Sequence, residues 1–396
     1  MPDLDELLDG FDHVETKREL QERLSEGKPL TVKLGLDPTS PDLHLGHAVV
    51  LRKLQQFVEG GHSVVLVIGS FTARIGDPSG RNELRPPLTT AEITTNMRTY
   101  AEQAGKVLDM ERVRLEYNST WLDRLTSADL LRLLSQVTVA QMLEREDFRD
   151  RYTEGTPIAL HEFLYPIAQA YDSIALHADV ELGGNDQLFN LLMGRQYQRE
   201  AGQREQVCLT VPLLEGLDGQ KKMSKTAGNY VGLIEPPEQQ FGKLMRIADE
   251  MISRYARLAA FRPEAECAQL SHALQNGKAH PMDEKKKVAE EVVARYHGAE
   301  AAKTAREYFE RTVQKRELPT ENVPEVKRGN ALRVIDVMVS VGLAESKRAA
   351  ERLVAGNGVR INGLVVEDPK ASWPSLDAPA MISVGSRKFV KVLPNE

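Results

Sequence analysis

The 396-residue chain contains very little cysteine and lacks long apolar runs. Its two cysteines, Cys208 and Cys267, stand alone, so the sequence supports neither a disulfide framework nor a cysteine-based zinc site. No apolar run approaches the roughly 20 residues of a membrane-spanning helix, and residues 1–10 are acidic and polar, unlike a signal peptide. We therefore expect a cytoplasmic protein with no membrane partner.

Strong compositional bias is absent as well. Apolar residues make up 41% of the chain and charged residues 28%, which excludes a disordered protein, and the length allows two or three domains. The net charge of −7 disfavours a nucleic-acid partner when the chain is considered as a whole, but the charge is unevenly distributed along the sequence. Residues 325–396 hold 11 Lys and Arg against 8 Asp and Glu, a surplus of 3, so the remainder carries −10. We therefore expect basic surface at the C-terminal end.

A histidine motif, Pro41-Asp-Leu-His-Leu-Gly-His47, follows a predicted strand at residues 32–36 and opens a predicted helix with Asp42 as its N-cap. At such a helix N-terminus, backbone N–H groups and the helix dipole favour an anion, and imidazoles add donors. Gly46 lets a nucleotide approach the backbone. An ordinary helix start that happens to contain two histidines is the alternative.

A lysine motif, Lys221-Lys-Met-Ser-Lys-Thr226, lies far along the chain, after a predicted strand at residues 207–214. Lys222 and Lys225 place positive charge on a loop framed by glycines, and we expect this loop, residues 221–235, to be mobile. Alone, the motif is more typical of a solvated lysine patch. Because both motifs occur in this order around an α/β core, we predict that they close on two sides of one ATP.

The form and order of the two motifs resemble the signatures of the class I aminoacyl-tRNA synthetases. This resemblance implies an ATP-binding parallel sheet of the Rossmann type and a reaction through an aminoacyl-adenylate. Between the motifs, apolar residues 64–68 predict a buried strand, and the glycine-rich segment 69–80 follows at its carboxyl end, where α/β sheets bind ligands. Arg81 and Arg85 come next, either as surface charge or as a second cationic arm over the pyrophosphate.

The helix predicted at residues 160–177 carries an unusual polar stripe. At 100° per residue, Tyr165, Gln169 and Asp172 fall within about 60° of one another, with apolar side chains centred on the opposite side. A solvent-facing stripe is the common alternative, but a stripe without lysine or arginine suits the wall of a polar pocket. Pro166 must lie in the first helical turn or kink the helix.

The spacing Tyr-x-x-x-Gln-x-x-Asp resembles the amino-acid-binding helix of tyrosine–tRNA ligases, and the match extends over nearly the whole chain. It implies that Tyr165 and Gln169 hold the substrate ammonium group together with Asp77, and that Asp172 accepts a hydrogen bond from the phenol hydroxyl. Gln187 would lie near the substrate carboxylate, and Asp186 near the ribose and the substrate. Asp37 matches a further pocket position.

One position departs from this family's pattern. In its best-known subgroup, the residue four before Asp37 is a tyrosine that hydrogen-bonds the substrate hydroxyl, whereas this chain has Lys33. Strand alternation puts Lys33 on the same side as Gly35 and Asp37. We hypothesise a role near the phenol hydroxyl, with pairing to Asp172 or a purely structural role as alternatives.

The resemblance further implies one set of catalytic and one set of nucleotide-binding residues. Catalysis would rest on His44, His47, Lys222, Lys225, Arg81 and Arg85. ATP would contact Thr39, His44, Gly46, His47, Gly183, Gly184, Asp186, Lys222, Met223, Ser224 and Lys225. Magnesium is expected to enter with ATP, and we expect no protein metal site, no zinc and no tightly bound organic cofactor.

We predict five segments along the chain. Residues 1–220 form the catalytic domain, with a helical N-terminal arm at 1–29 and a mostly helical insertion near 88–150 that contains one strand at 113–117. The resemblance makes this insertion the interface of a homodimer. After the lysine loop, residues 236–320 form an all-helical domain that would hold the tRNA anticodon arm, 321–330 a linker, and 331–396 a small α+β domain.

The last segment combines two helices with strands joined by Asn-Gly turns. Its second helix carries Lys347, Arg348 and Arg352. The segment resembles an RNA-binding module shared by a ribosomal small-subunit protein and pseudouridine synthases, in which such residues would contact structured RNA. A structural cap with chance basic residues is the alternative.

Together these features predict a ligase that activates L-tyrosine with ATP and transfers it to the 3′ end of tRNA(Tyr). A nucleotidyltransferase acting on a small acid would explain neither the polar stripe nor the RNA-binding module. An RNA-binding protein on a synthetase scaffold would not need Lys222 and Lys225. A tryptophan-specific relative is disfavoured by Asp172 and by the C-terminal module.

Overall fold

The computed structural model describes residues 4–78, 89–97, 99–314, 323–327, 331–374, 378–385 and 388–394. The chain divides into two compact units, one comprising Met1–Pro236 and Lys243–Val292, the other Pro237–Gly242 and Val293–Glu396. Each unit is described by itself.

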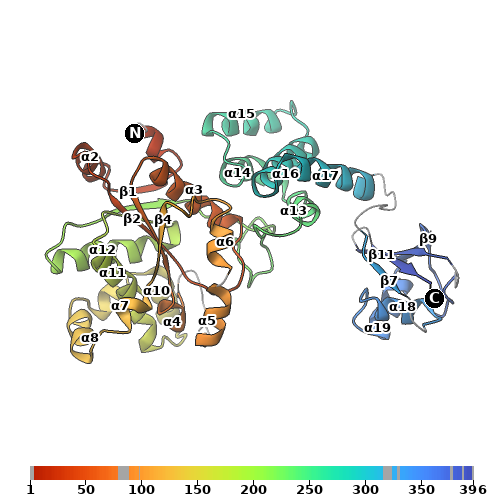
Figure 1. The fold of residues 1–396 in the computed structure, drawn as a ribbon, viewed down its shortest axis with the longest axis horizontal. Helices are drawn as coiled ribbons and strands as arrows, with labels where there is room; N and C mark the ends of the chain where they lie inside the picture. Colours follow the sequence, from red (N-terminus) through yellow and green to blue (C-terminus); the bar gives the residue numbers. More distant parts are fainter. Residues whose placement is uncertain are drawn as a thin grey trace. The chain divides into compact units, whose positions relative to one another are not determined.

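The first unit is built on a six-stranded sheet in the order β1-β6-β5-β2-β3-β4. Strands β6, β5, β2, β3 and β4 are parallel to one another. Strand β1 pairs antiparallel with β6 at one edge (Figure 1). The strands span His13–Glu15 (β1), Thr31–Leu36 (β2), Ser63–Ile68 (β3), Val113–Tyr117 (β4), Val180–Gly184 (β5) and Val207–Val211 (β6). The predicted α/β fold with a Rossmann-type parallel sheet is confirmed.

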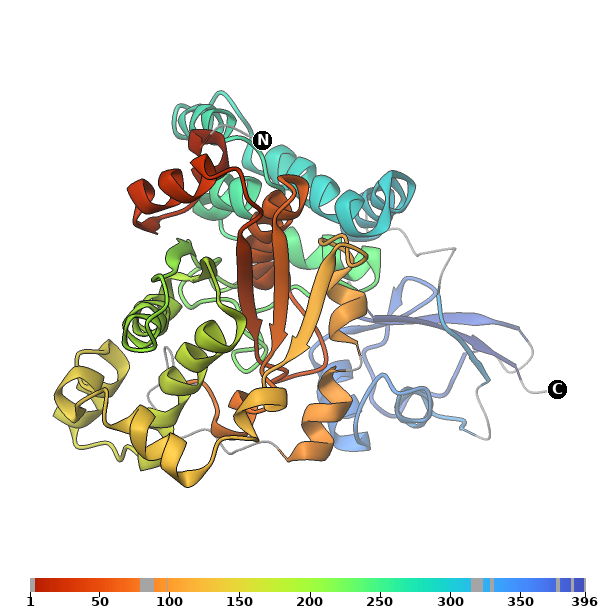
Figure 2. The same ribbon diagram turned by 60° about the vertical axis from the view of Figure 1, so that its left-hand side comes forward.

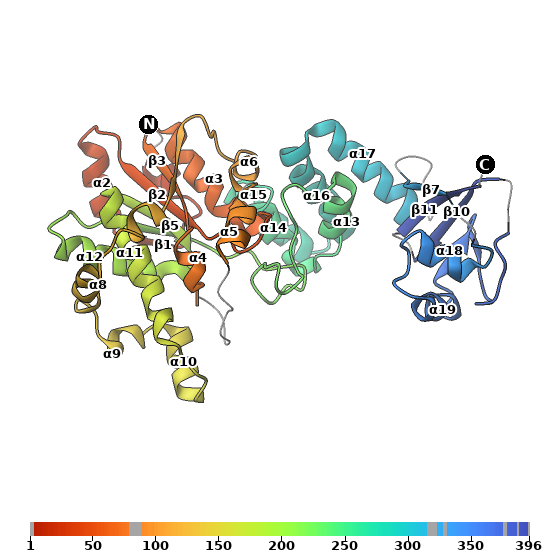
Figure 3. The same cartoon turned by 60° about the horizontal axis from the view of Figure 1, so that its bottom comes forward.

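Helices cover both faces of this sheet, with α3 (Leu45–Glu59) on one face and α11 (Leu164–Leu176) and α12 (Leu188–Glu200) on the other (Figures 1 and 3). The central strands therefore read as apolar runs, because both faces are buried. In β2, Val32 and Leu34 alternate with Lys33, whose ammonium group reaches α11. Pro166 lies in the first turn of α11, the first of the two alternatives that the sequence left open, and its missing N–H there leaves no helical hydrogen bond unmade.

The N-terminal arm differs from the prediction of a purely helical segment. Between α1 (Leu4–Leu8) and α2 (Lys17–Ser25) lies β1, a strand of three residues that the central sheet recruits at its edge. Strand β4, predicted within the helical insertion, pairs with β3 as part of the central sheet (Figure 2). The helices of this region span Thr72–Ile75 (α4), Thr90–Met97 (α5), Tyr100–Ala104 (α6), Ser119–Leu122 (α7), Ser127–Leu134 (α8), Val139–Met142 (α9), Glu146–Glu154 (α10) and, as a 3-10 turn before α11, Leu160–Phe163 (η1).

Residues 237–314 are helical, as predicted. The helices span Pro237–Leu244 (α13), Asp249–Met251 (η3), Ile252–Leu258 (α14), Glu264–Gln275 (α15), Pro281–His297 (α16), Ala299–Phe309 (α17) and a π-helical turn, Glu310–Gln314 (η4). Pro237 is the first residue of α13, and Pro263 directly precedes α15. Both positions suit proline, whose missing N–H has no helical partner at the start of a helix.

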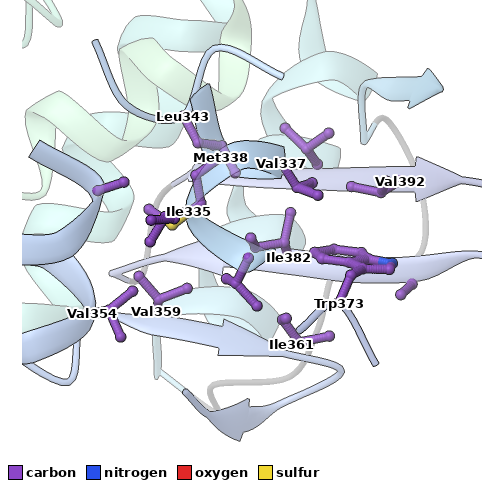
Figure 4. Close-up of a cluster of buried hydrophobic side chains, with 14 residues drawn as sticks. Ile335, Val337, Met338, Leu343, Val354, Val359, Ile361, Trp373, Ile382 and Val392 are labelled. Atoms are coloured by element: carbon purple, nitrogen blue, oxygen red, sulfur yellow. The ribbon is translucent and has the colours of Figure 1, made fainter. Parts of the chain in front are cut away.

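The C-terminal segment forms a second sheet in the order β7-β11-β10-β8-β9. Its strands span Glu325–Lys327 (β7), Val359–Ile361 (β8), Leu364–Val365 (β9), Ala380–Val384 (β10) and Lys388–Leu393 (β11), and its helices Val334–Ser340 (α18) and Lys347–Ala355 (α19). Figure 4 shows the hydrophobic core of this segment, in which Ile335, Val337 and Met338 of α18 cluster with Ile382 and Trp373. Positive φ angles at Asn362 and Gly363 form the predicted tight turn between β8 and β9.

Strand β7 corrects the predicted linker at 321–330. Its residues Glu325–Lys327 pair in parallel with β11, so this part of the segment belongs to the C-terminal sheet. The short strand has too few residues to show alternation, and its pairing partner lies more than 60 residues away. Across the described ranges, no helix is long and apolar enough to cross a bilayer.

Candidate active site

The histidine motif forms the start of α3, and His44 rather than Asp42 is the N-cap residue. Asp42 instead forms an ion pair with Lys225. Burial, assisted by the charges of Lys225 and Lys222, lowers the pKa of His47 to about 4 and that of His44 well below 6.5. Both imidazoles are therefore neutral at pH 7.

The backbone fixes the tautomer of His47. Its Nδ1 accepts a hydrogen bond from the backbone N–H of His44 at 3.2 Å, so the proton of the neutral ring must reside on Nε2. Gly46 gives the His44 ring its room, because a Cβ at Gly46 would lie 3.0 Å from two atoms of that ring. The glycine thus makes room for the neighbouring histidine, in addition to the predicted approach of a nucleotide.

The lysine motif lies on a hairpin that closes with a bridge between Glu215 and Lys222. Asn229 holds the loop from inside: its Oδ1 accepts from the Ser224 N–H at 2.8 Å, and its Nδ2 donates to Asp218 at 2.8 Å. Met223, between Lys222 and Lys225 of the motif, is buried. Lys222 Nζ lies 2.7 Å from Asp186 Oδ2.

Main-chain hydrogen bonds bring the two motifs together. The Leu45 N–H donates to Val231 O at 3.0 Å, and the Leu233 N–H donates to Leu43 O at 3.0 Å, so the segment after the lysine motif pairs with the turn that holds His44. The ammonium groups of Lys222 and Lys225 are close enough to lower the pKa of both histidines. Two motifs that are about 180 residues apart thus share one location.

The polar side chains of α11 lie beside the carboxyl end of β2. The Tyr165 hydroxyl donates to Asp37 Oδ2 at 3.0 Å, and the Thr72 hydroxyl donates to Asp37 Oδ1 at 2.7 Å. A Cβ at Gly69 would lie 1.8 Å from Asp37 Oδ1, so only glycine allows this approach. By contrast, a Cβ at the exposed Gly35 would meet no atom within 4 Å, which leaves open space on the α11 side of β2.

Asp172 is 4% exposed and is held by two uncharged donors. Trp121 Nε1 donates to Oδ1 at 2.7 Å, and Asn118 Nδ2 donates to Oδ2 at 3.3 Å. Among the described residues, no lysine or arginine forms an ion pair with Asp172. Burial therefore dominates and raises its pKa to about 6, against the opposing charge of Lys33.

A second group of polar residues joins α12 to the segment after α4. Gln187 Nε2 donates to Asp77 Oδ2 at 3.0 Å, and Arg145 lies 3.4 Å from Asp77 Oδ1. Asn190 Nδ2 donates to both Gln187 Oε1 and Gln169 Oε1, each at 3.0 Å. The structure thus brings Asp77, Gln169 and Gln187 into one hydrogen-bonded network.

Lys33 is turned toward β5 rather than toward Asp172. Its Nζ lies 3.1 Å from Glu181 Oε1 and donates to the main-chain oxygen of Gln169 at 3.1 Å. Lys33 is 2% exposed and Glu181 1%, so the pair is buried. The pairing with Asp172 that the sequence left open is therefore replaced by an ion pair with Glu181.

The remaining predicted residues divide into three groups. Gly183 and Gly184 end β5, and Thr39 lies in the turn between β2 and the histidine motif. Arg81 and Arg85 lie outside the described residues. In the C-terminal unit, Lys347 forms an ion pair with Asp336 at 2.8 Å, while Arg348 and Arg352 are exposed one helical turn apart on α19.

Several residues of this network are not among those predicted from the sequence, namely Thr72, Asn118, Trp121, Arg145, Glu181 and Asn190. Glu181 alone had a usable signal, because it is an acidic residue inside an otherwise apolar strand. No group of three or more His, Cys, Asp or Glu residues that could hold a metal ion occurs in the part of the chain that the structure describes.

Comparison with known proteins identifies the family. Residues 25–314 match the family described as "tRNA synthetases class I (W and Y)", and residues 332–371 match the S4 domain. The tyrosine–tRNA ligase of Thermotoga maritima is 50% identical over 377 residues, covering 95% of this chain and 94% of that protein. The tyrosine–tRNA ligase of Shewanella oneidensis is 47% identical over 398 residues, covering 99% of each chain.

Solved structures agree on the fold. The tyrosyl-tRNA synthetase of Archaeoglobus fulgidus, in complex with L-tyrosine, superposes with a TM-score of 0.62 at 23% identity, covering 76% of this chain and 98% of that one. The enzyme from Aeropyrum pernix also gives a TM-score of 0.62, at 21% identity over 78% of this chain and 98% of that one. With the paired motifs and the polar face of α11, these matches establish that the chain belongs to the tyrosine–tRNA ligase family of the class I aminoacyl-tRNA synthetases.

Proposed function

We propose that the protein activates L-tyrosine with ATP and transfers the tyrosyl group to tRNA(Tyr). In the first step, a tyrosine carboxylate oxygen bonds to the α-phosphorus of ATP while the bond to pyrophosphate breaks, giving tyrosyl-adenylate. In the second, a terminal ribose hydroxyl of the tRNA attacks the activated carbonyl and AMP leaves. Asp172 carries this proposal, because a buried carboxylate held by only two uncharged donors has lone pairs left for a phenol hydroxyl.

The amino end of tyrosine is proposed to bind beside Tyr165, Gln169 and Asp77. Because the Tyr165 hydroxyl donates its proton to Asp37, its oxygen can accept from an ammonium group. Asp77 adds negative charge nearby, and Gln187 is assigned to the carboxylate side. The open space over Gly35 would receive the substrate between β2 and α11.

Catalysis of the first step would consist of positioning and charge stabilisation. His44 and His47 would donate to phosphate oxygens from neutral rings, while Lys222 and Lys225 would neutralise the negative charge of the leaving pyrophosphate. Thr39, Gly46, Gly183, Gly184, Asp186, Met223 and Ser224 are assigned to ATP, with help from Arg81 and Arg85. This role requires Lys222 and Lys225 to leave Asp186 and Asp42, so the proposal includes movement of the loop 221–235.

Magnesium is proposed to enter with ATP. Asp42 and Asp186, the partners of Lys225 and Lys222, each offer a single carboxylate beside the motifs, which fits an ion held mainly by phosphate oxygens and water. Bound there, magnesium would neutralise phosphate charge. The protein's own residues would orient the triphosphate around it.

Recognition of tRNA is proposed to use the helical region and the C-terminal domain. Arg348 and Arg352 present two adjacent positive charges on α19, which suits contacts to RNA phosphates. Residues 236–320 are assigned to the anticodon arm. We further propose a cytoplasmic location.

A homodimer formed through the insertion is proposed from its exposed apolar side chains. Large exposed hydrophobic residues gather in and beside the region of α8 to α12, namely Leu131, Leu134, Val139, Tyr152, Leu160 and Leu192. Exposed apolar side chains in such number favour a protein interface.

Charging of a tRNA(Tyr) transcript with labelled tyrosine tests the complete reaction. We expect tyrosyl-tRNA to accumulate with tRNA(Tyr), and no charging of tRNA(Trp) by tryptophan. Charging with tryptophan but not with tyrosine would overturn the proposal.

A further inference from the structure

The buried pair of Lys33 and Glu181 lies directly beneath Gln169. Gln169 Nε2 donates to Glu181 Oε1 at 3.0 Å, the same oxygen that lies 3.1 Å from Lys33 Nζ. Lys33 also donates to the main-chain oxygen of Gln169 at 3.1 Å. Both charges therefore act on one residue of α11, through its side chain and through its backbone.

A carboxylate at this place dictates which way the Gln169 amide points. An ionised carboxylate only accepts hydrogen bonds, so the Gln169 NH2 group must face Glu181 and the carbonyl oxygen must face away. The other side of Gln169 is consistent with this orientation. Arg145, which only donates, binds Asn190 Oδ1 at 3.1 Å, so Asn190 turns its NH2 group toward Gln169 Oε1.

This arrangement leaves Gln169 Oε1 available to a ligand. Within the described part of the chain, this oxygen accepts one hydrogen bond, from Asn190 at 3.0 Å, and a carbonyl oxygen has two lone pairs. Gln169 is partly exposed, whereas Glu181 and Lys33 are 1% and 2% exposed. The buried pair therefore touches no ligand itself.

We propose that Lys33 and Glu181 are positioning residues that lock the Gln169 amide with its oxygen toward the ammonium group of the substrate. Lys33 is the buried counter-charge of Glu181, and Glu181 sets the orientation of the amide. This inference rests on the proposed function, because it takes tyrosine as the ligand of Gln169. It moves Lys33 from the hydroxyl side of the substrate to the ammonium side.

The double variant Lys33→Met/Glu181→Met tests this inference. It removes both charges at similar volume, a change that buried ion pairs often tolerate, and it leaves Gln169 without its fixed acceptor. Removing two opposite charges together also partly offsets their effects on Asp172, since Lys33 lowers its pKa and Glu181 raises it. Calorimetry would measure the Kd of tyrosine, of tyramine, and of 3-(4-hydroxyphenyl)propanoate, which lacks the ammonium group.

We expect the Kd of tyrosine and of tyramine to rise about tenfold or more, the range for a hydrogen bond to a charged group, and the Kd of the propanoate to stay within about twofold. The ratio of the tyrosine and phenylalanine affinities should not change. Equal weakening of all three ligands, no weakening of any, or a changed tyrosine-to-phenylalanine ratio would each overturn the inference.

Two further proteins complete the experiment. Ser173→Ala removes a donor to the other oxygen of Glu181, at 3.3 Å, and should leave all three Kd values unchanged. If the double methionine variant does not fold, Lys33→Met/Glu181→Gln keeps a polar group beside Ser173. Its amide can turn either end toward Gln169, so we expect a smaller but still selective rise in the Kd of tyrosine and tyramine. Wild-type protein that does not bind tyrosine would overturn the proposed function instead, so the two failures are distinguishable.

Discussion

The titration of Asp172 gives the sharpest prediction of how tyrosine is recognised. Burial raises its pKa to about 6, and its only partners among the described residues are the uncharged donors Trp121 and Asn118. Protonation removes a charged acceptor that the phenol hydroxyl is proposed to use. Tyrosine affinity should therefore fall as the pH is lowered through about 6.

The size of the effect follows from the pKa. With a pKa of about 6, the carboxylate fraction is about 0.97 at pH 7.5 and about 0.24 at pH 5.5, so KM for tyrosine should rise about fourfold over that interval. Phenylalanine has no hydroxyl, and its KM should not follow this curve. In Asp172→Asn the curve should be flat, and kcat/KM for tyrosine should fall about 10-fold to about 100-fold, as expected for one hydrogen bond to a charged group.

Tyrosine-dependent exchange of pyrophosphate into ATP, measured from pH 5.5 to pH 8, provides these KM values. Phenylalanine at high concentration is the matched control substrate. A tyrosine KM that does not change with pH, or one that changes in parallel with that of phenylalanine, would refute the assignment of Asp172 to the hydroxyl.

Four other predictions follow from the described contacts. Because burial favours protonated Asp172, its ionisation costs stability as the pH rises from about 4 to about 6, so Asp172→Asn should melt no lower than wild type at pH 7.5 in thermal denaturation. Since the pKa of His47 is lowered to about 4, single-turnover rates of adenylate formation should show no histidine titration between pH 6 and pH 8, and such a titration would contradict neutral rings. Gly69→Ala should lower kcat/KM for tyrosine about 100-fold by displacing Asp37, whereas Gly242→Ala, with open space around its Cβ, should leave it unchanged. Arg348→Glu/Arg352→Glu should weaken tRNA binding in a filter assay without altering pyrophosphate exchange, and equal loss of both would refute a separate RNA-binding role.

Sequence patterns predicted the elements that local order determines. Strands β3 and β4 follow from short apolar or alternating runs, and α11 follows from an apolar face that continues over its whole length. Strand β1 was missed because three residues carry no periodicity, and it exists only through its pairing with β6, almost 200 residues later. For the same reason, the sequence predicts a linker where the short β7 lies.

The candidate site shows the same division. The histidine and lysine motifs and the stripe on α11 could be predicted because each is contiguous or periodic in sequence. Trp121 and Asn118 could not, because they reach Asp172 from more than 50 residues away and nothing local marks them. Lys33 was recognised as unusual, but its partner Glu181 depends on the register of β2 and β5, which only the folded sheet defines.

Pyrophosphate exchange with tyrosine, tryptophan and phenylalanine as separate substrates tests the central claim most directly. We predict exchange that depends on tyrosine, because Asp172 is assigned to the hydroxyl of the substrate ring and the polar face of α11 to the substrate ammonium group. Exchange driven equally well by phenylalanine or by tryptophan, or no exchange from folded protein, would contradict it.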